Sequence, residues 1–277
     1  MKKSAENSTI SILGCGWLGA PLARRLLAEG YTVKGSTTST EKMSVMKGVG
    51  IEPFLLRLEP GLQGSAEDFF QTDLLIIDIP PKSRKEGDDF HPAQIKAISD
   101  EIKKHKISHC LYVSSTSVYP NLEREVKEED AGIKGGHAAI SGAENILKSI
   151  SGLNCTILRC GGLMGYDRIP GRYFAGQKNL TTGQVPVNYI HRDDVIGIIT
   201  AIIRQNYWNE TLNAVAPQHP TRQEVYEQNA REFDFEAPTF APAEAEGFKV
   251  VSSDKLLSEL NYQFLHPNPL EFPYSHS

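Results

Sequence analysis

Three glycines near the start of the chain have the spacing of a diphosphate-binding turn. Gly14, Gly16 and Gly19 follow an apolar run and precede a helix-like run. The first permits a sharp turn, the second lets backbone approach a diphosphate, and the third lets the helix pack closely on the strand. Backbone amides at the helix start then attract the anion. We predict a dinucleotide site at Gly14, Gly16, Trp17, Leu18 and Gly19; the alternative is a glycine-rich turn that binds nothing.

The segment after the second predicted strand bears on which dinucleotide binds. An NAD site usually has a carboxylate about 20 residues beyond the glycine motif. Here hydroxyl residues fill that place, and no acid appears before Glu41. Hydroxyls and a lysine accept a 2′-phosphate that a carboxylate would repel. We predict NADP(H) contacts at Ser36, Thr37, Thr38 and Lys42. NAD remains an alternative cofactor because this segment has no arginine to bind the 2′-phosphate. A second alternative is that these residues begin the next helix and bind no cofactor.

A second row of hydroxyls follows the strand-like run at residues 109–114. The sequence Leu-Tyr-Val-Ser-Ser-Thr-Ser-Val-Tyr-Pro occupies residues 111–120. Open α/β sheets hold their ligands at the carboxyl ends of the strands, so these hydroxyls are predicted to lie at a ligand-binding edge.

Together with the glycine motif, this segment resembles the extended short-chain dehydrogenase/reductase family, which includes sugar-nucleotide epimerases and dehydratases. The family motif is an apolar strand, Ser-Ser or Ser-Thr, two variable residues and Val-Tyr-Gly. Ser115 matches the catalytic Ser/Thr, and Pro120 replaces the glycine. Residues 158–165, 188–195 and 249–269 are also similar to family segments. The resemblance implies further cofactor contacts at Ile79, Pro80, Val113, Ser114, Gly161 and Gly162.

The chain departs from this family at the acid/base pair. Family catalysis uses Tyr-x-x-x-Lys on one helix face, whereas the matching positions here are Gly136 and Ile140, which cannot titrate. One interpretation is an oxidoreductase or epimerase with a substitute proton donor, either His137, which could titrate near neutrality, or Tyr119. With Ser115 these are the predicted catalytic residues. The other interpretation is a non-catalytic protein that senses NADP(H).

Cations and a tyrosine define the predicted substrate side. Lys82 and Arg84 follow the fourth predicted strand, where they could hold an anionic group; a solvated loop is the simpler interpretation. By the resemblance, Arg192 and Tyr166 border the same site. The rest of the pocket is expected from residues 171–186 and 211–269. The substrate is predicted to be small, with a sugar nucleotide among the classes considered, and its identity is not encoded in any motif.

Alternating strand-like and helix-like runs must position these residues. This alternation predicts an α/β fold, a Rossmann-type doubly wound parallel sheet with a small C-terminal α/β substrate-binding region. The nucleotide domain is predicted at 8–160, with 187–206 returning to it, and the substrate region at 161–186 and 207–277. Strands are expected at 10–13, 31–36, 51–58, 73–79, 109–114 and 155–159, and helices at 92–104, 138–150 and 193–204.

Bulk properties exclude several classes of protein. A net charge of −5 gives no basic field, so nucleic-acid binding is not expected. The four cysteines lie in or beside apolar runs without metal-ligand spacing, which indicates reduced, buried thiols and no metal site. No apolar run has membrane-spanning length and no signal peptide is recognised. We expect a cytoplasmic protein with a small-molecule substrate and no membrane partner. A homodimer is expected only because members of the family often dimerise.

Overall fold

The computed structural model describes residues 8–242 and 247–275, which form two compact units. The first unit contains Met1–Ser115, His137–Leu158 and Ile202–Thr211, and the second contains Thr116–Gly136, Arg159–Ala201 and Leu212–Ser277. This division differs from the predicted domains chiefly at 116–136 and 187–201, which belong to the second unit. Each unit is described below by itself.

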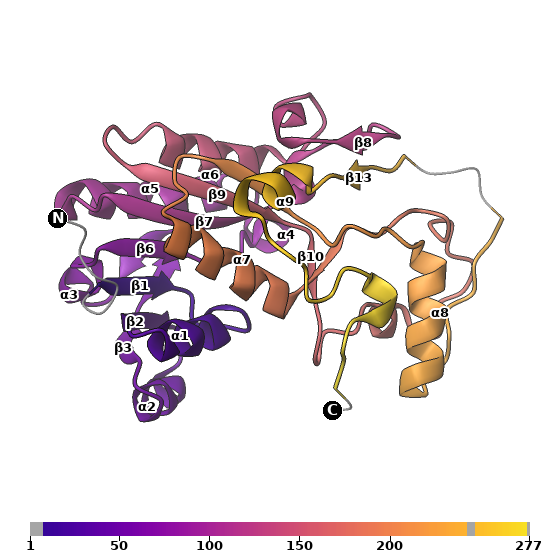
Figure 1. Cartoon of the computed structure of the whole chain (residues 1–277), viewed down its shortest axis with the longest axis horizontal. Coiled ribbons are helices and arrows are strands. Elements are labelled where there is room, and N and C mark those ends of the chain that lie inside the picture. The colour runs from indigo at the N-terminus through magenta and orange to yellow at the C-terminus, as the bar shows by residue number, and fades with distance from the viewer. Residues whose placement is uncertain (1–7, 243–246, 276–277) are drawn as a thin grey trace. The chain divides into compact units, whose positions relative to one another are not determined.

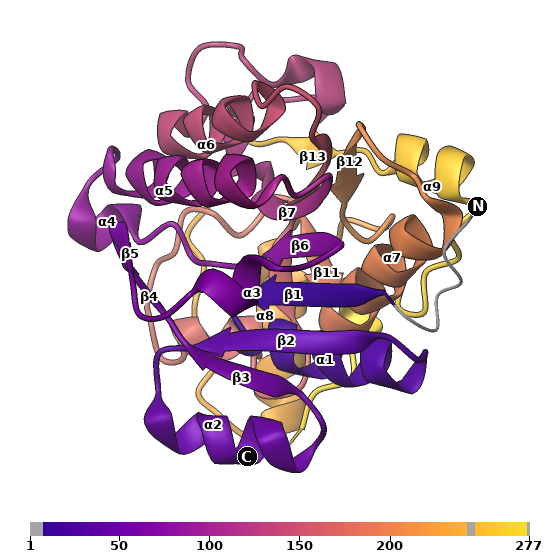
Figure 2. The same cartoon turned by 90° about the vertical axis from the view of Figure 1, so that its left-hand side faces the viewer.

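A seven-stranded sheet confirms the predicted Rossmann-type fold. Its order is β12-β9-β7-β6-β1-β2-β3, and the pairs β1–β2, β1–β6, β2–β3 and β6–β7 are parallel. Figure 2 shows β6, β1, β2 and β3 side by side. The strands are β1 (Thr9–Leu13), β2 (Thr32–Thr37), β3 (Glu52–Leu55), β6 (Leu74–Ile77), β7 (His109–Ser115), β9 (Asn154–Cys160) and β12 (Thr211–Ala214).

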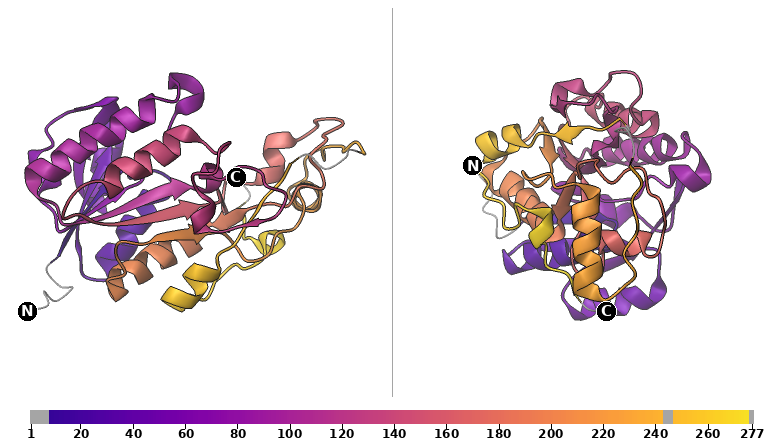
Figure 3. Two further views of the ribbon diagram at one scale, coloured as in Figure 1. Left: turned by 90° about the horizontal axis from the view of Figure 1, so that it is seen from above. Right: turned by 90° about the vertical axis from the view of Figure 1, so that its right-hand side faces the viewer.

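The strands at the centre of the first unit are buried on both faces. All four residues of β6 are buried, as are the last four of β1. Burial on both faces explains the continuous apolar run of β6, and the one polar side chain among the buried residues of β1, Ser11, donates to the Phe69 carbonyl oxygen. Helix α1 turns Leu22, Ala23 and Leu26 inward. In the left panel of Figure 3, α5 and α6 run side by side along the sheet. The helices of this unit are α1 (Gly19–Ala28), α2 (Thr40–Gly48), α3 (Glu67–Phe70), α4 (Ser83–Glu86), α5 (Phe90–His105) and α6 (Ala138–Lys148).

The strand order reverses at β1, which lies between β2 and β6. Such a reversal opens a crevice at the carboxyl ends of the strands. The predicted strand 51–58 is interrupted at Leu56, whose amide donates to the Thr37 carbonyl oxygen at 3.0 Å. Beyond it, β4 (Arg57–Glu59) and β5 (Gly61–Gln63) form an antiparallel hairpin, which turns at Pro60.

The second unit combines short parallel strand pairs with helices. β10 (Gly162–Met164) pairs with β11 (Tyr189–His191), and β8 (Glu125–Val126) pairs with β13 (Val250–Val251), the latter two lying side by side in Figure 1. The predicted helix 193–204 is α7 (Arg192–Gln205), whose last residues belong to the first unit. The other elements are α8 (Arg222–Phe233), α9 (Asp254–Leu260) and the 3-10 turns η2 (Thr116–Val118), η3 (Glu128–Asp130), η4 (Pro170–Phe174) and η5 (Pro269–Glu271).

Helix α8 begins with reciprocal hydrogen bonds between its N-cap residue Thr221 and Glu224. Thr221 accepts from the Glu224 amide, and the Glu224 carboxylate accepts from the Thr221 amide, which together form a capping box. Tyr226 and Val225 on its buried face pack with Val187 in a small core. The helix is the upright orange one in the right panel of Figure 3.

All four cysteines are free and buried, as the sequence predicts. Within residues 8–242 and 247–275, no helix combines the length and the apolar character that crossing a bilayer requires.

Candidate nucleotide and substrate sites

In the glycine turn of the first unit, the packing of the protein leaves no room for a side chain at Gly14 or Gly19, but it does leave room at Gly16. Gly14 has φ +110°, and a Cβ there would lie 2.0 Å from the Asp78 carbonyl oxygen. A Cβ on Gly19 would lie 2.3 Å from the Gly14 carbonyl oxygen. At Gly16 a Cβ would meet nothing within 4 Å. The space over Gly16 is therefore open on the protein side, which is what the approach of a diphosphate to the backbone needs.

The start of α1 offers the positive end of its dipole to this space. Leu18 is the N-cap residue and forms no side-chain cap, and the first turn carries no acid. The turn itself is held by the buried Ser36, whose hydroxyl oxygen accepts the Gly14 N–H at 2.8 Å. An anion at this helix start would gain from both the amides and the dipole.

A pocket of about 270 Å³ lies along the glycine turn. It brings together nine residues that the sequence predicts for cofactor or substrate: Gly14, Gly16, Ser36, Thr37, Thr38, Lys42, Ile79, Pro80 and Lys82. The predicted contacts Trp17, Leu18, Gly19, Val113 and Ser114 do not line it. The side chain of Arg84 lies outside the described residues.

Six pocket residues were not predicted from the sequence, and two of them, Cys15 and Asp78, have ionisable side chains. Burial, followed by the nearby Asp78 carboxylate, raises the pKa of the Cys15 thiol to about 12. Cys15 therefore stays protonated at neutral pH and cannot act as a nucleophile. Asp78 lines the same pocket directly after β6. Its place at the end of an apolar strand was the only signal that could have pointed to it.

An arginine of the β4–β5 hairpin is hydrogen-bonded to a residue that lines the pocket. The Arg57 guanidinium donates from Nη2 to the Thr38 carbonyl oxygen at 3.3 Å. Thr38 and Lys42, which both line the pocket, are exposed. Glu41 accepts from Ser39 at 2.5 Å, and its hydrogen bonds lower the pKa of its carboxyl. The sequence interpretation missed Arg57 because the β4–β5 hairpin, and not the segment after β2, carries it.

The positions that match the family's tyrosine and lysine are closed by the protein itself. A Cβ on Gly136 would lie 1.8 Å from the Val118 carbonyl oxygen, so no side chain fits at this position of the second unit. Ile140 is 2% exposed and belongs to the buried face of α6. The departure seen in the sequence therefore has a packing cause at both positions.

Two of the predicted catalytic residues lie in the first unit. Ser115 ends β7 and is half-buried. His137 is the half-buried N-cap residue of α6, and its side chain makes no cap hydrogen bond. The hydroxyl of Ser114, in contrast, donates to Glu144 Oε1 at 2.6 Å, and both side chains are buried.

The third predicted catalytic residue, Tyr119, lies in the second unit with its hydroxyl fully engaged. The phenol is 1% exposed, donates to Asn213 Oδ1 at 2.7 Å and accepts from Arg159 at 2.7 Å. Burial raises the pKa of Tyr119 to about 12. The Glu128 carboxylate accepts from the Asn213 amide at 2.8 Å. These hydrogen bonds join segments that lie far apart in the chain, and the raised pKa keeps the Tyr119 hydroxyl protonated at neutral pH.

Tyr166 and Arg192, both predicted for substrate, lie together in the second unit. The Arg192 guanidinium carbon is 3.9 Å from the centre of the Tyr166 ring, and the Tyr166 hydroxyl donates to Asp193 Oδ2 at 2.7 Å. The predicted cofactor residues Gly161 and Gly162 are crowded. Cβ atoms there would lie 2.4 Å from the Asn188 carbonyl oxygen and 2.7 Å from the Tyr189 ring, respectively.

His191, Asp193 and His266 place metal-ligating atoms within 4.8 Å of one another. The sequence interpretation named no metal site. In the structure, Nδ1 of the buried His191 accepts the Asp193 amide at 3.2 Å. The Asp193 carboxylate is the acceptor for Tyr166. His191 Nδ1 and the Asp193 carboxylate are therefore already hydrogen-bonded at the start of α7.

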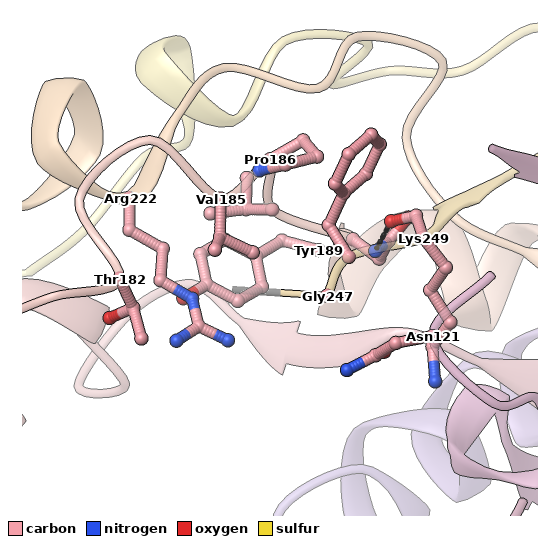
Figure 4. Close-up of a pocket in the computed structure, with 11 residues that line it drawn as sticks. Asn121, Thr182, Val185, Pro186, Tyr189, Arg222, Gly247 and Lys249 are labelled. Atoms are coloured by element: carbon pink, nitrogen blue, oxygen red, sulfur yellow. Dashed lines mark hydrogen bonds between the residues drawn. The ribbon is translucent and has the colours of Figure 1, made fainter. Parts of the chain in front are cut away.

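A second pocket, of about 290 Å³, lies within the second unit (Figure 4). Its polar side chains include Arg222, Lys249, Asn121 and Thr182, and Tyr189 forms part of the wall. The sequence interpretation gave only the stretches 171–186 and 211–269 for this region and named none of these residues. No spacing motif joins them, because three loops and a helix start bring them together.

Comparisons with known proteins agree with the fold and the cofactor class. Residues 14–206 match a family model described as NAD(P)H-binding. The protein YeeZ of Escherichia coli (strain K12) is 34% identical over 270 residues, which cover 95% of this chain and 98% of YeeZ.

Solved structures with low sequence identity share the fold. A putative NAD-dependent epimerase/dehydratase from Methylobacillus flagellatus is 23% identical, with a TM-score of 0.73 over 94% of each chain. A UDP-glucose-4-epimerase from Stenotrophomonas maltophila, solved with NAD and formylated UDP-arabinopyranose, is 15% identical, with a TM-score of 0.77 over 96% of this chain and 95% of that one. The predicted resemblance to epimerase/dehydratase and short-chain dehydrogenase/reductase proteins is thereby confirmed.

Proposed function

The chain belongs to the NAD(P)H-binding family, and from that premise we propose that it is an NADP(H)-linked oxidoreductase or epimerase acting on a small substrate. The observation that carries the proposal is the pocket of the first unit. It joins an open glycine turn at Gly16 to hydroxyls and a cation at Thr38 and Lys42. Main-chain amides there suit a diphosphate, and the polar end suits a phosphorylated ribose.

The preference for NADP(H) over NAD(H) rests on Arg57. Its guanidinium lies 3.3 Å from the carbonyl oxygen of Thr38, which lines the pocket as Lys42 does, and a planar fork of donors binds phosphate in a bidentate manner. No carboxylate ends β2, where an NAD site would have one. Glu41 is the competing charge, and hydrogen bonds from Ser39 and Thr40 tie it to the start of α2.

His137 is the group that we assign to proton transfer, with Ser115 orienting the reacting oxygen. His137 is one residue from the family's tyrosine position, half-buried, and free of any cap hydrogen bond from its side chain. We leave Tyr119 out of this role because its hydroxyl is committed to Asn213 and Arg159. A sugar nucleotide is the substrate class that the UDP-sugar-binding structural neighbour suggests.

The packing at Gly136 favours a second candidate, a non-catalytic protein that senses NADP(H). The Val118 main chain fills the place of a tyrosine side chain, so the usual acid is excluded by backbone and not merely substituted. The two candidates differ in whether hydride leaves the bound cofactor.

Cofactor titration tests the binding half of the proposal. We expect NADPH to quench Trp17 fluorescence and to bind more tightly than NADH. Arg57→Ala should weaken NADPH about tenfold and NADH less than about twofold, because only the 2′-phosphate is lost. Arg24→Ala, an exposed arginine on α1, is the matched control. NADH binding equal to or tighter than NADPH binding would refute the preference.

Hydride transfer separates the enzyme from the sensor. Wild-type protein is incubated with 4-deuterated NADPH and a panel of UDP-sugars and small ketones, and deuterium in the products is followed by mass spectrometry. His137→Ala should abolish transfer while NADPH affinity is retained, and His109→Ala should leave transfer intact. Tight NADPH binding without transfer to any substrate of the panel would favour the sensor.

The cytoplasmic location and the homodimer stay predictions. Fractionation of cells that produce the protein tests the first, and light scattering of the purified chain tests the second.

A further inference from the structure

A buried hydrogen-bond chain crosses the first unit from β7 to the β4–β5 hairpin. It links the hydroxyl of Tyr112 on β7 to His91 Nε2 at 2.6 Å, and His91 Nδ1 to Gln94 Oε1 at 3.1 Å. Nε2 of Gln94 then donates to the Leu58 carbonyl oxygen at 2.9 Å. These residues are 8% exposed or less, and His91 is fully buried. None of them is among the site residues predicted from the sequence.

The direction of each hydrogen bond follows from the groups themselves. A main-chain carbonyl oxygen only accepts, so the amide nitrogen of Gln94 faces Leu58 and its oxygen faces His91. His91 Nδ1 must therefore carry a hydrogen, and Nε2 of the neutral ring accepts from the Tyr112 hydroxyl. Burial lowers the pKa of His91 and raises that of Tyr112, which favours this neutral arrangement. An imidazole suits the middle of the chain because it donates on one side and accepts on the other.

The buried hydrogen-bond chain ends at the residue that anchors the hairpin. Of residues 57–63, which the structure describes throughout and which form β4, Pro60 and β5, only Leu58 is buried. The hairpin forms a two-stranded sheet of its own, separate from the seven-stranded sheet. Helix α5, which carries His91 and Gln94, packs on β5 and lies beside it in Figure 2. The position of the hairpin therefore depends chiefly on the burial of Leu58 and on the hydrogen bond that its carbonyl oxygen accepts.

Leu58 connects the buried hydrogen-bond chain to the cofactor pocket. Leu58 and Gln94 both line the pocket along the glycine turn. Arg57, which directly precedes Leu58, donates to the carbonyl oxygen of Thr38, another lining residue. Neighbouring Cα atoms stay ~3.8 Å apart, so a displacement of Leu58 moves Arg57 as well. His91 does not line the pocket, so it acts on a bound cofactor only through its neighbours.

We propose that His91 is a positioning residue for NADP(H) specificity, because through Gln94 and Leu58 it fixes the hairpin that carries Arg57. The inference deepens the proposed function, which assigns Arg57 to the 2′-phosphate, and rests on it. A guanidinium distinguishes NADPH from NADH only while its donors stay within hydrogen-bond distance of the phosphate, a range about half an ångström wide. Without His91, the Gln94 amide is free to turn and the Leu58 carbonyl oxygen has no fixed donor, so Arg57 loses its position.

The binding test is a titration of the full-length protein with NADPH and with NADH. His91→Leu should weaken NADPH about fivefold or more and NADH less than about twofold, as expected when only the contact to the 2′-phosphate is lost. In protein that already carries Arg57→Ala, the same change should have no further effect on NADPH, because both changes remove one contact. His91→Asn keeps an N–H donor at the place of Nδ1 and should recover part of the preference for NADPH.

Two further variants control for folding. Ile98 is buried on the same face of α5, one turn after Gln94, and lies outside the buried hydrogen-bond chain. Ile98→Val should lower the unfolding midpoint and leave the ratio of NADPH to NADH affinity within about twofold of wild type. If His91→Leu does not fold, Gln94→Met, which removes the donor to Leu58 and keeps the length of the side chain, should give the same fall in that ratio.

Hydrogen exchange tests the position of the hairpin without any cofactor. Mass spectrometry follows the main-chain amides of residues 56–64 in the free protein. They should exchange about tenfold faster or more in His91→Leu, and at the wild-type rate in Ile98→Val, because only the first change releases the hairpin.

The outcomes separate this inference from the function on which it rests. Hairpin exchange that is the same in His91→Leu and wild type, or an equal loss of NADPH and NADH affinity, would overturn the positioning role. So would a His91→Leu effect on NADPH that is as large without Arg57 as with it. Arg57→Ala without effect on NADPH would overturn the proposed cofactor preference and the role of His91 in it, while hydrogen exchange would still report whether His91 holds the hairpin.

Discussion

The two pockets of this chain are built by opposite means. In the first unit the ligand space exists because side chains are missing, with Gly16 open above and main-chain amides at the start of α1. In the second unit the space is defined by side chains, and Arg222 and Lys249 supply its charge. Amides bind any diphosphate in the right place, whereas the positions of side-chain charges decide which substrate is accepted. The first pocket therefore offers main-chain donors, and the second offers side-chain charges.

The largest expected effect is a loss of stability when the backbone of the glycine turn, which forms the first pocket, is disturbed. Gly14→Ala places a Cβ 2.0 Å from the Asp78 carbonyl oxygen at a residue with φ +110°. Strain and overlap together should cost about 3 kcal/mol of unfolding free energy or more. Urea denaturation followed by circular dichroism measures it. A variant as stable as wild type would show that the turn can move, and the account of its packing would fail.

An intermediate effect separates binding from stability in the same turn. Gly16→Ala adds a Cβ that meets nothing within 4 Å, so its unfolding midpoint should match wild type. The methyl group would instead meet the approaching diphosphate, and NADPH affinity should fall about tenfold or more. Fluorescence titration checks this result. Unchanged affinity would mean that the open space over Gly16 is not the diphosphate site.

The smallest expected effect is the loss of stability at acid pH that results from protonation of His191, in the second unit. Burial, and then the positive charge of His266, lower the pKa of His191 to about 4. A pKa lowered on folding contributes stability that is complete above the unfolded value and is lost as pH falls towards the folded value. Between pH 7.5 and 5.5 the unfolding free energy should therefore drop by about 1 kcal/mol from this group.

Urea midpoints at the two pH values measure that drop, with His191→Asn as the comparison. The variant should lose this part of the pH dependence, since asparagine does not titrate. A slope that is the same in both proteins would assign the acid sensitivity to other groups.

The first pocket could be read from the sequence in outline, because its parts are close together in the chain. The glycine spacing, the apolar strand before it and the hydroxyls after β2 are local features, and nine predicted residues line the pocket that forms. Arg57 and Asp78 escaped because each follows a different strand. The order of strands in the sheet brings Asp78 beside Gly14, and the β4–β5 hairpin brings Arg57 to Thr38.

The absence of the family's tyrosine and lysine could also be predicted from the sequence, but the structural cause of that absence could not. The sequence places Gly136 and Ile140 at the matching positions, which excludes titration there. Only the structure reveals that the Val118 main chain occupies the space of any side chain at residue 136. It likewise decides that the Tyr119 hydroxyl is buried and bound to Asn213 and Arg159, which lie far along the chain.

The sequence by itself determined the fold class, the cofactor family and the glycine turn, since strand periodicity and glycine spacing act through neighbouring residues. Tertiary structure alone decided the pocket of the second unit. Arg222, Lys249 and Asn121 lie far apart in the chain, and hydrogen bonds to the Val185 and Tyr119 carbonyl oxygens and from the Asn188 side chain hold two of them in position. Charges of this kind have no sequence pattern, because their meeting depends on how distant loops pack.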